Sequence, residues 1–576
     1  MRPRAFFLFC AALFVTAVAI RLIHLHQIRP IPLFDHLIGD AAGYDDWARE
    51  IASGQWLGRD VFYQAPLYPY FLATLYKIVG HSLLGVRIVQ SALGAGACVL
   101  LAMAGREFFS PRVGVVAGAL LAIYPAAIFF DGIIQKSVLD LVLVCLLLYL
   151  LGASLNRPST LRWIAIGATL GALMLTRENA GVLVVVILAW IALGPNVAGR
   201  GPRLKAAAFV AAALAAVLLP VALRNAIVGG EFHITTAQLG PNLYIGNNPG
   251  ADGAYVPLVY GHSSPQQERA DAIALAQRAV GRTLSPNEVS RFWVDQVMRF
   301  IRDRPDEWLR LMRVKFILFW NATELGDTED QYAYADWSVP LRVLNPLLTF
   351  GVLCAAATAG FGLTCTHWRR LWVLYAIILV YAASVIAFYV MARYRFPVVP
   401  ALMLFAAAAL VGLWDAARGK TGAPQGWMVF LCLIAATAVW LETRPIRNEM
   451  VRASTYQNIG RVLDDQNKLD EAFTYYAKAR DLWPADPLVH ILLGRIRLDQ
   501  NKPADALPYF IEAVRLAPND APAHVAYGAG LLAAGQADAA AAEFHHALEI
   551  DPQNPRAQEG LRQARSRRNT DNSFRL

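Results

Sequence analysis

The sequence predicts an all-α polytopic membrane protein that ends in a helical repeat domain outside the membrane. Two observations predict the membrane part. The 576-residue chain is 56% hydrophobic and only 16% charged, whereas soluble domains carry about 25% charged residues. Apolar segments of roughly the ~20 residues that cross a bilayer also recur along the first three quarters of the chain. A third observation, a regular spacing of small residues and prolines near the C-terminus, predicts the repeats.

About eleven apolar segments are expected to form transmembrane helices. They cover residues 5–24, 86–105, 113–130, 137–155, 161–176, 179–196, 206–223, 343–364, 371–391, 396–414 and 426–441. The first segment has a basic start and an Ala-rich end, as signal peptides do. However, Arg21 follows the uninterrupted apolar run of residues 5–20 in place of a small-residue cleavage site, so an uncleaved anchor is expected.

The distribution of Lys and Arg predicts the orientation. One set of short loops contains most of these residues, whereas the opposite set contains only Lys136, Arg177, Arg393 and Arg395. Cytoplasmic loops are enriched in Lys and Arg. The N-terminus is therefore expected in the cytoplasm, and the C-terminal repeats in the periplasm if the membrane is a bacterial inner membrane. Loop anchoring also accounts for the net charge of +9, so no nucleic-acid partner is expected.

The C-terminal region repeats itself every 34 residues. Pro484, Pro518 and Pro552 keep this interval. Four further columns of Gly, Ala and aromatic residues have the same spacing, beginning at Gly460, Ala472, Tyr476 and Ala479. This is the tetratricopeptide pattern, in which small residues allow two helices to pack closely around an aromatic ring. We expect a membrane domain over 1–444, with external loops 25–85 and 224–341, and a repeat domain over 445–576 with repeats at about 454–562. Such arrays bind other proteins.

The first external loop contains GDAAGYDDWAREI, residues 39–51. Tyr44, Trp47, Ala48 and Ile51 have the i, i+3, i+4, i+7 spacing of an amphipathic helix, which we expect to lie on the outer leaflet. Asp40 is either the N-cap of this helix or a functional carboxylate. Asp45 and Asp46 are expected on its solvated face.

Four features of the chain resemble the GT-C class of membrane glycosyltransferases, in particular family 39. This family includes protein O-mannosyltransferases and the bacterial lipid A aminoarabinose transferase. The features are Asp40 with Tyr44 and Ala48, the segment Tyr63-Gln64-Ala65-Pro66-Leu67, Arg224-Asn225 before NLYIGNNPGADGAY, and Arg393-Tyr394-Arg395-Phe396-Pro397. They cover about residues 5–415.

The resemblance implies transfer of a sugar from a polyprenyl-phosphate donor to an acceptor hydroxyl on the external face. Asp40 is expected to be the general base. Arginines are expected to stabilise the departing lipid phosphate, although each could instead be an interface residue that snorkels. The expected substrate-binding residues are Tyr44, Tyr63, Gln64, Arg177, Arg224, Arg393, Tyr394 and Arg395.

Two further acids, Asp131 and Asp140, lie near the external ends of spans and are secondary acid candidates. Asp140 could instead pair with Lys136, four residues earlier. The aminoarabinose branch has Glu-Lys-Pro where this chain has Gln64-Ala65-Pro66. A carboxylate that could help to hold a metal is therefore missing, and the need for a divalent cation stays open.

The sequence thus predicts a lipid-linked-sugar glycosyltransferase whose repeats recruit an acceptor or partner protein. Two alternatives remain. An O-antigen ligase or polymerase also has many spans and a large external loop, but would lack an aspartate in a long first external loop. A non-catalytic scaffold for glycan assembly would use the repeats alone, and would leave the clustered Arg and Asp residues unexplained.

Overall fold

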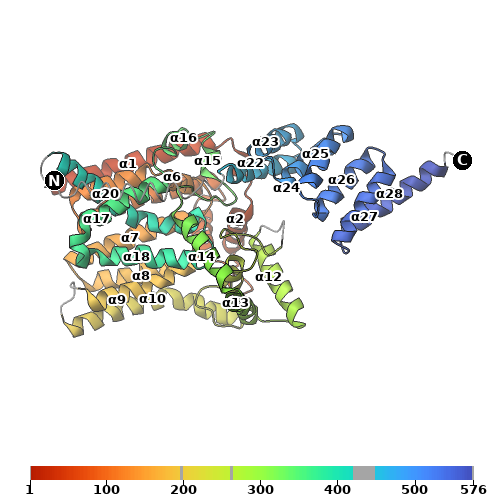
Figure 1. Ribbon diagram of the computed structural model, residues 1–576. Helices are drawn as coiled ribbons and strands as arrows, with labels where there is room; N and C mark the ends of the chain where they lie inside the picture. The colour runs from red at the N-terminus through yellow and green to blue at the C-terminus, as the bar shows by residue number, and fades with distance from the viewer. Residues whose placement is uncertain (1, 195–198, 260–263, 419–447, 574–576) are drawn as a thin grey trace. The chain divides into compact units, whose positions relative to one another are not determined.

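The computed structural model describes residues 2–194, 199–259, 264–418 and 448–573, and these ranges contain helices and turns but no strand (Figure 1). The chain divides into two compact units. The membrane unit takes the described residues of Met1–Arg29, Leu37–Asp327 and Tyr334–Ile446, and the repeat unit takes those of Pro30–His36, Thr328–Ala333 and Arg447–Leu576. Two short segments, residues 30–36 and 328–333, therefore belong to the repeat unit, although the residues on both sides of them in the sequence belong to the membrane unit.

Six helical stretches of the membrane unit are long and apolar enough to cross a bilayer. They are α1 (Pro3–Ile28), α4 (Leu83–Phe108), α7 (Ser137–Asn156), α10 (Arg200–Gly229), the pair α17 (Phe350–Thr364) and α18 (Trp368–Ile386), and the pair α19 (Ala392–Arg395) and α20 (Val399–Ala417). A seventh is reached if α5 (Pro111–Ala122) and α6 (Pro125–Gly132) form one span bent by 53°. Pro125 at the start of α6 has no N–H with which to continue α5.

These helices correspond only in part to the eleven expected spans. Two expected spans, 161–176 and 179–196, coincide with shorter apolar helices, α8 (Thr160–Met174) and the stretch Glu178–Leu193 that contains α9 (Val182–Leu193). The expected spans 343–364 and 371–391 fall in one stretch, Phe350–Ile386. The expected span 426–441 lies outside the described residues. Length and composition therefore support a helical membrane protein with six or seven long spans among the described residues.

The segments 25–85 and 224–341, expected from the sequence to be external loops, are also largely helical, as is the chain up to residue 344. They form α2 (Gly39–Ala52), α3 (Leu67–Val79), α11 (Leu239–Gly246), α12 (Pro265–Val280), α13 (Pro286–Asp303), α14 (Pro305–Trp320), α15 (Gln331–Tyr334, which crosses into both units) and α16 (Val339–Leu344). Capping boxes at Ser264 and Ser285 begin α12 and α13. In each, the serine hydroxyl accepts from a backbone N–H, and a Gln or Glu side chain returns to the serine N–H.

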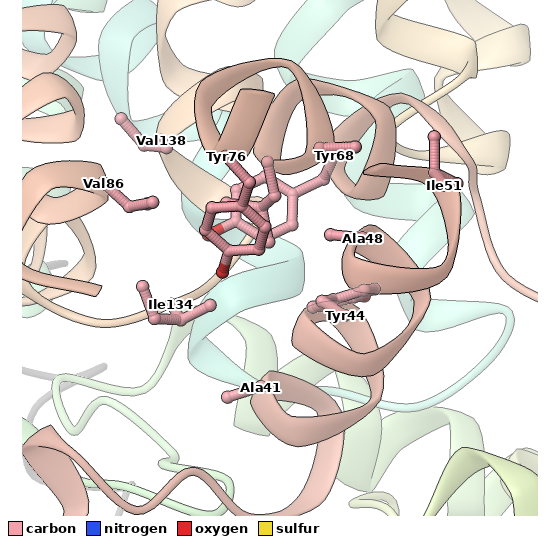
Figure 2. Packing of buried hydrophobic residues seen from close by; sticks show 11 residues of the cluster. Ala41, Tyr44, Ala48, Ile51, Tyr68, Tyr76, Val86, Ile134 and Val138 are labelled. Carbon is pink, nitrogen blue, oxygen red and sulfur yellow. The ribbon is translucent and has the colours of Figure 1, made fainter. Parts of the chain in front are cut away.

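The apolar face of α2 is covered by protein, not by lipid. Tyr44, Ala48 and Ile51 are fully buried, and they pack with Tyr68 and Tyr76 of α3 in one cluster (Figure 2). The helical spacing was therefore predicted correctly, and the apolar face is buried by protein. The reason is that α3 follows closely in the chain and offers its own aromatic face to α2, with the Tyr44 and Tyr68 rings 5.3 Å apart.

Lys315 on α14 is completely buried in the external part of the membrane unit. Its ammonium donates to Asn247 Oδ1 at 2.9 Å, and Trp308 Nε1 donates to the same oxygen at 3.2 Å. Burial lowers the pKa of Lys315 to about 7. The unfolded chain, with a Lys pKa near ~10.4, binds more protons than the folded chain between these values. The Lys315 contribution to stability should therefore rise as the pH increases from about 7 toward ~10.4.

We expect Lys315→Met to raise the midpoint of thermal unfolding at pH 7, by about 2 °C or more, because it removes a buried charge that has one hydrogen bond and no ion pair among the described contacts. Asn247 Oδ1 keeps its bond from Trp308. Lys315→Arg, which cannot lose its charge, should lower the midpoint instead. The measurement is the unfolding midpoint of the detergent-solubilised protein. A lower midpoint for Lys315→Met would contradict this account.

The described C-terminal residues of the repeat unit form seven α-helices: α22 (Asn448–Asp465), α23 (Leu469–Leu482), α24 (Pro487–Asp499), α25 (Pro503–Leu516), α26 (Ala521–Ala533), α27 (Ala537–Ile550) and α28 (Pro555–Ser573). Each of the three glycines spaced 34 residues apart contacts the aromatic ring of its own repeat. A Cβ added at Gly494 would lie 2.5 Å from the ring of Phe510, and Gly460 and Gly528 are equally close to Tyr476 and Phe544. The 34-residue interval thus reflects a repeated close approach of paired helices.

We expect Gly494→Ala to destabilise the repeat unit by about 1–3 kcal/mol, because the added methyl overlaps a buried ring. Adding Phe510→Leu should recover part of this loss, since the smaller side chain leaves room for the methyl. Both effects can be measured as shifts in the denaturant midpoint of the full-length protein. A double variant less stable than the sum of the single changes would contradict the proposed overlap.

Candidate functional site

Asp40 lies in the first turn of α2, but it does not cap the helix. The N-cap position is Ile38, and the helix begins at Gly39. The Asp40 carboxylate instead accepts from Gln64 Nε2 at 3.1 Å and from Arg393 Nη1. The N-cap interpretation of Asp40 is therefore wrong, and the carboxylate is bound by two residues from distant parts of the chain.

Arg393 joins two carboxylates at this site. Its Nη1 contacts Asp40, and the same nitrogen lies 3.0 Å from Asp327 Oδ2. The Arg393 side chain is only 11% exposed and that of Asp40 17%. The guanidinium also lies over the ring of Tyr394, 5.1 Å from its centroid. Residues 40, 64, 327 and 393 are thus brought together from four separate segments.

Charge compensation sets the protonation of Asp40. Burial alone would raise the pKa of this carboxyl, but Arg393, the hydrogen bond from Gln64 and the charge of Lys136 outweigh burial and hold the pKa below its usual range. Asp40 is therefore an anion at neutral pH. A carboxylate in this state can accept a proton, although its pairing with Arg393 makes it a weaker base than a free aspartate.

A second ion pair lies beside the first. Arg177 Nε is 2.6 Å from Asp140 Oδ2, with both side chains buried, and the Arg177 guanidinium lies over the Tyr394 ring at 4.8 Å from its centroid. Arg177 and Arg393 therefore share contact with one tyrosine. The expected pairing of Asp140 with Lys136 is replaced by Arg177, because the chain that follows α8 returns this arginine to the start of α7.

Several polar atoms around Tyr394 have no hydrogen-bond partner. Among the residues that the structure describes, Tyr44 Oη, Arg177 Nη1 and Arg393 Nε are buried donors without an acceptor. The Tyr44 hydroxyl is electrostatically coupled to Asp40, Arg393, Tyr394 and Arg177, and burial raises its pKa well above the usual value, so it stays protonated. Buried donors without acceptors are costly, and they mark a place where an anionic ligand would be bound.

Two other predicted residues, Arg224 and Arg395, are engaged elsewhere. Arg224 donates to the carbonyl oxygens of Leu57 and Asp60 and lies over the Phe62 ring. Arg395 pairs with Glu324 at 2.8 Å and donates to backbone carbonyls of the 318–323 turn, including Asn321 O at 2.7 Å. The structure does not bring either guanidinium to Asp40; both hold external loops to the helices.

The secondary acid Asp131 is also separate from Asp40. It is buried on α6, and its Oδ2 lies 2.6 Å from Arg21 Nε of α1. On α2, Asp45 is buried as well: it accepts from the Tyr76 hydroxyl at 2.5 Å and lies 2.8 Å from His81 Nε2. The expectation that Asp45 lies on a solvated face is therefore wrong, because α3 and the following turn supply partners for it.

Two acidic residues of the site were not predicted from the sequence. One is Asp327, which shares Arg393 with Asp40. The other is Glu268 on α12, whose carboxylate accepts from the hydroxyls of Tyr63 at 2.8 Å and Tyr255 at 2.7 Å. Both belong to the long external segment 224–341. No local pattern distinguishes them from solvent-exposed acids; only the fold places them.

The acidic residues do not form a metal site. In the described ranges, no group of three or more His, Cys, Asp and Glu side chains could hold a metal ion. The Asp40 oxygens already accept from Arg393 and Gln64, and a cationic partner repels a divalent cation. The donors present at Asp40 therefore do not fit a hard cation that prefers several oxygen ligands.

Comparison with protein families identifies two parts of the chain. Residues 63–223 match the family model described as dolichyl-phosphate-mannose-protein mannosyltransferase. The matched region is therefore similar to this mannosyltransferase family. It includes Tyr63, Gln64, Asp140 and Arg177 of the predicted site. Residues 453–482 and 497–565 match tetratricopeptide repeat models, which confirms the repeats. The comparison with curated proteins found no match.

Solved structures resemble the two parts at low identity. The apo oligosaccharyltransferase of Archaeoglobus fulgidus is 15% identical, with 82% of this chain and 60% of that chain covered and a TM-score of 0.45. ArnT from Cupriavidus metallidurans bound to undecaprenyl phosphate is 16% identical over 71% and 79% of the two chains, with a TM-score of 0.31. The Arabidopsis OM64 tetratricopeptide domain is 20% identical over 21% and 98%, with a TM-score of 0.20.

Proposed function

We propose that this protein is a membrane glycosyltransferase that moves a sugar from a polyprenyl-phosphate donor to an acceptor hydroxyl. One arrangement carries the proposal. Arg393 contacts the Asp40 carboxylate, and nearby buried donors, including Arg393 Nε and Arg177 Nη1, have no hydrogen-bond acceptor. A base beside hydrogen-bond donors that can bind an anion is what this reaction requires. The mannosyltransferase-family match over residues 63–223 supports the same reaction class.

The donor phosphate would bind at Tyr394, between the two arginines. Arg177 Nη1, Arg393 Nε and the Tyr44 hydroxyl are the unpaired donors there. Together they would supply two positive charges and a neutral hydrogen bond to a phosphate that gains charge as the sugar departs. Arg393 belongs to the Ala392–Ala417 stretch and lies at its N-terminal end. This position suits a phosphate held at the membrane surface by its polyprenyl chain.

Asp40 would act as the general base. The acceptor oxygen forms a bond to the anomeric carbon, the bond between that carbon and the phosphate oxygen breaks, and the polyprenyl phosphate leaves with the bonding electrons. The acceptor proton passes to Asp40. Gln64 holds the second carboxylate oxygen at 3.1 Å and would fix the orientation of the base during the transfer.

Donor binding would also activate this base. Without phosphate, Arg393 pairs with Asp40 and lowers its pKa. A bound phosphate would compete for the same guanidinium, so that the Asp40 carboxylate would lose part of its compensation and become more basic. Asp327, which also contacts Arg393, would keep the guanidinium positioned during this exchange.

The reaction would take place on the periplasmic side of a bacterial inner membrane, with the N-terminus in the cytoplasm. The distribution of Lys and Arg in the loops supports this orientation. The tetratricopeptide repeats would bind an acceptor protein or a partner of the same assembly, as such arrays bind other chains.

The test is release of the lipid phosphate from labelled undecaprenyl-phosphate sugars by the purified protein. The panel should begin with the mannose donor, because of the family match, and include other hexoses and pentoses, with membrane proteins and peptides rich in Ser and Thr as acceptors. Transfer above the level of a mock purification supports the proposal. A folded protein that neither binds nor cleaves any donor of the panel refutes it.

A further inference from the structure

A second group of polar side chains lies next to the proposed base, outside the phosphate site. Glu268 of α12 accepts from Tyr63 and Tyr255, one hydroxyl on each carboxylate oxygen. The three residues come from the first external loop and from two places in the segment 224–341. Helix α12 also packs against α2, where Pro265 and Gln266 adjoin Gly43. The helix that carries Glu268 therefore packs against the helix that carries Asp40.

The charges of Asp40 and Arg393 both act on Glu268. Burial raises the pKa of Glu268, the two tyrosine hydroxyls lower it in part, and Asp40 and Arg393 act on it in opposite directions. Glu268 is thus within electrostatic reach of both residues of the proposed reaction, although no hydrogen bond or ion pair between Glu268 and either of them is found among the described contacts.

A row of tyrosines connects Glu268 with the phosphate site. Tyr255 packs against Tyr389 with ring centroids 5.5 Å apart, and Tyr389 packs against Tyr394 at 5.4 Å. Tyr394 in turn lies under Arg177 and Arg393. Aromatic faces and polar hydroxyls thus run from the arginines to Glu268, and each ring presents an apolar body with a polar end.

This arrangement fits a ligand with several hydroxyl groups. A carboxylate oxygen has two lone pairs, and a tyrosine hydroxyl can accept as well as donate. Glu268 therefore keeps acceptor capacity beyond its two tyrosines, and both tyrosine oxygens can still accept. A phosphate has no hydroxyl to donate in its dianionic form and would be repelled by Glu268. A sugar ring offers hydroxyl donors and an apolar face together.

We propose that Glu268, Tyr63 and Tyr255 bind the hydroxyl groups of the sugar carried by the polyprenyl-phosphate donor. This inference rests on the proposed function and assigns the sugar-recognition part of the same site. Glu268 is a specificity-determining residue in this view. It acts on the sugar, while Arg393 and Arg177 act on the phosphate, so the two halves of the donor are recognised by separate groups.

The experiment compares binding of two probes, undecaprenyl phosphate without a sugar and undecaprenyl-phosphate mannose, followed by the other sugars of the panel. Glu268→Gln should weaken binding of the sugar-bearing donor about 10-fold or more, because a charged acceptor becomes a neutral amide. Tyr255→Phe should weaken it by about 3- to 10-fold. Binding of undecaprenyl phosphate should stay within about 2-fold of wild type for both.

Asp306→Asn is the matched control. Asp306 lies in the same external segment and pairs with Arg310, but both side chains are about three-quarters exposed. The Asp306→Asn variant loses one negative charge, as Glu268→Gln does. It should bind both probes with the affinity of the wild-type protein. Tyr255→Phe retains the aromatic ring and removes only the hydroxyl. It therefore still tests the sugar contact if Glu268→Gln fails to fold.

Equal weakening of both probes would overturn the proposal, because it would place Glu268 at the phosphate. Unchanged donor binding with a raised KM for the acceptor would also overturn it and would assign Glu268 to the acceptor. Binding is measured without turnover. A wild-type protein that binds sugar-bearing donors but transfers nothing would therefore refute the proposed activity, while the comparison of Glu268 variants would still decide the binding role.

Discussion

Asp40→Asn is expected to lower the rate of sugar transfer by about 10²- to 10⁴-fold, the usual contribution of a general base. Asparagine has nearly the same shape and can still accept a hydrogen bond from Gln64, but it cannot take the acceptor proton. Arg393 keeps Asp327 as a partner, so the buried guanidinium is not left without a carboxylate. The measurement is kcat with a labelled donor and a saturating acceptor.

Asp46→Asn is the matched control for this variant. Asp46 is on the same helix and is 59% exposed, paired with Arg49. It loses the same charge without touching the site, and its kcat should equal that of wild type. If Asp40→Asn is folded and turns over at the wild-type rate, Asp40 is not the base. If Asp46→Asn lowers kcat as much as Asp40→Asn does, the loss comes from the reduced negative charge of α2 and not from the missing base.

Arg393→Gln is expected to produce the second large loss, about 10²- to 10³-fold in kcat/KM. The variant removes the guanidinium that would bind the departing phosphate and that fixes Asp40. Arg393→Lys should recover only part of the activity, since an ammonium keeps the charge but loses the planar fork. Arg310→Gln, which removes an exposed arginine, is the control and should leave kcat/KM unchanged.

The pH dependence separates the two roles of Arg393. Asp40 must be ionised to act as a base, so kcat/KM falls as the pH drops through the Asp40 pKa. In wild type Arg393 opposes the effect of burial and keeps this pKa below the usual range. In Arg393→Gln burial is less compensated, so the pKa rises and the acid limb of kcat/KM should move to higher pH. An acid limb at the wild-type position would show that Arg393 does not control Asp40.

Local patterns in the sequence distinguished Asp40 and Arg393 from their neighbours but did not decide their roles. Asp40 stands at the start of a segment with helical spacing, which fits an N-cap, and Arg393 begins a late apolar stretch, which fits an interface residue; the resemblance to family 39 is what proposed both for the site. Their pairing could not be predicted, because 353 residues separate them. The N-cap interpretation of Asp40 failed for a local reason: the helix begins at Gly39, one residue before the carboxylate, so Asp40 belongs to the first turn.

Other residues of the region are placed by tertiary contacts, which no local sequence pattern predicts. Asp45 has the sequence context of an exposed helical acid, yet Tyr76 and His81 enclose it. Glu268 and Asp327 lie in a long segment rich in ordinary polar residues. They gain partners only because the fold brings Tyr63 to Glu268 and Arg393 of α19 to Asp327. The repeats were the opposite case, since each glycine–aromatic contact lies within one 34-residue interval and leaves a direct record in the sequence.

The chain segments that make up the repeat unit determine where this protein can be cut for domain exchange. Residues 30–36 and 328–333 are inserted in the chain of the membrane unit, yet η1 (Pro32–Phe34) packs against α22, and Asn458 Nδ2 donates to Thr328 O at 2.8 Å. The second insertion begins directly after Asp327, and the first ends four residues before Asp40. The repeats are therefore not an interchangeable module joined by one hinge. A chimaera that exchanges the repeats must therefore also carry both loop segments, because these belong to the repeat unit and are joined in the chain to the segments that carry Asp40 and Asp327.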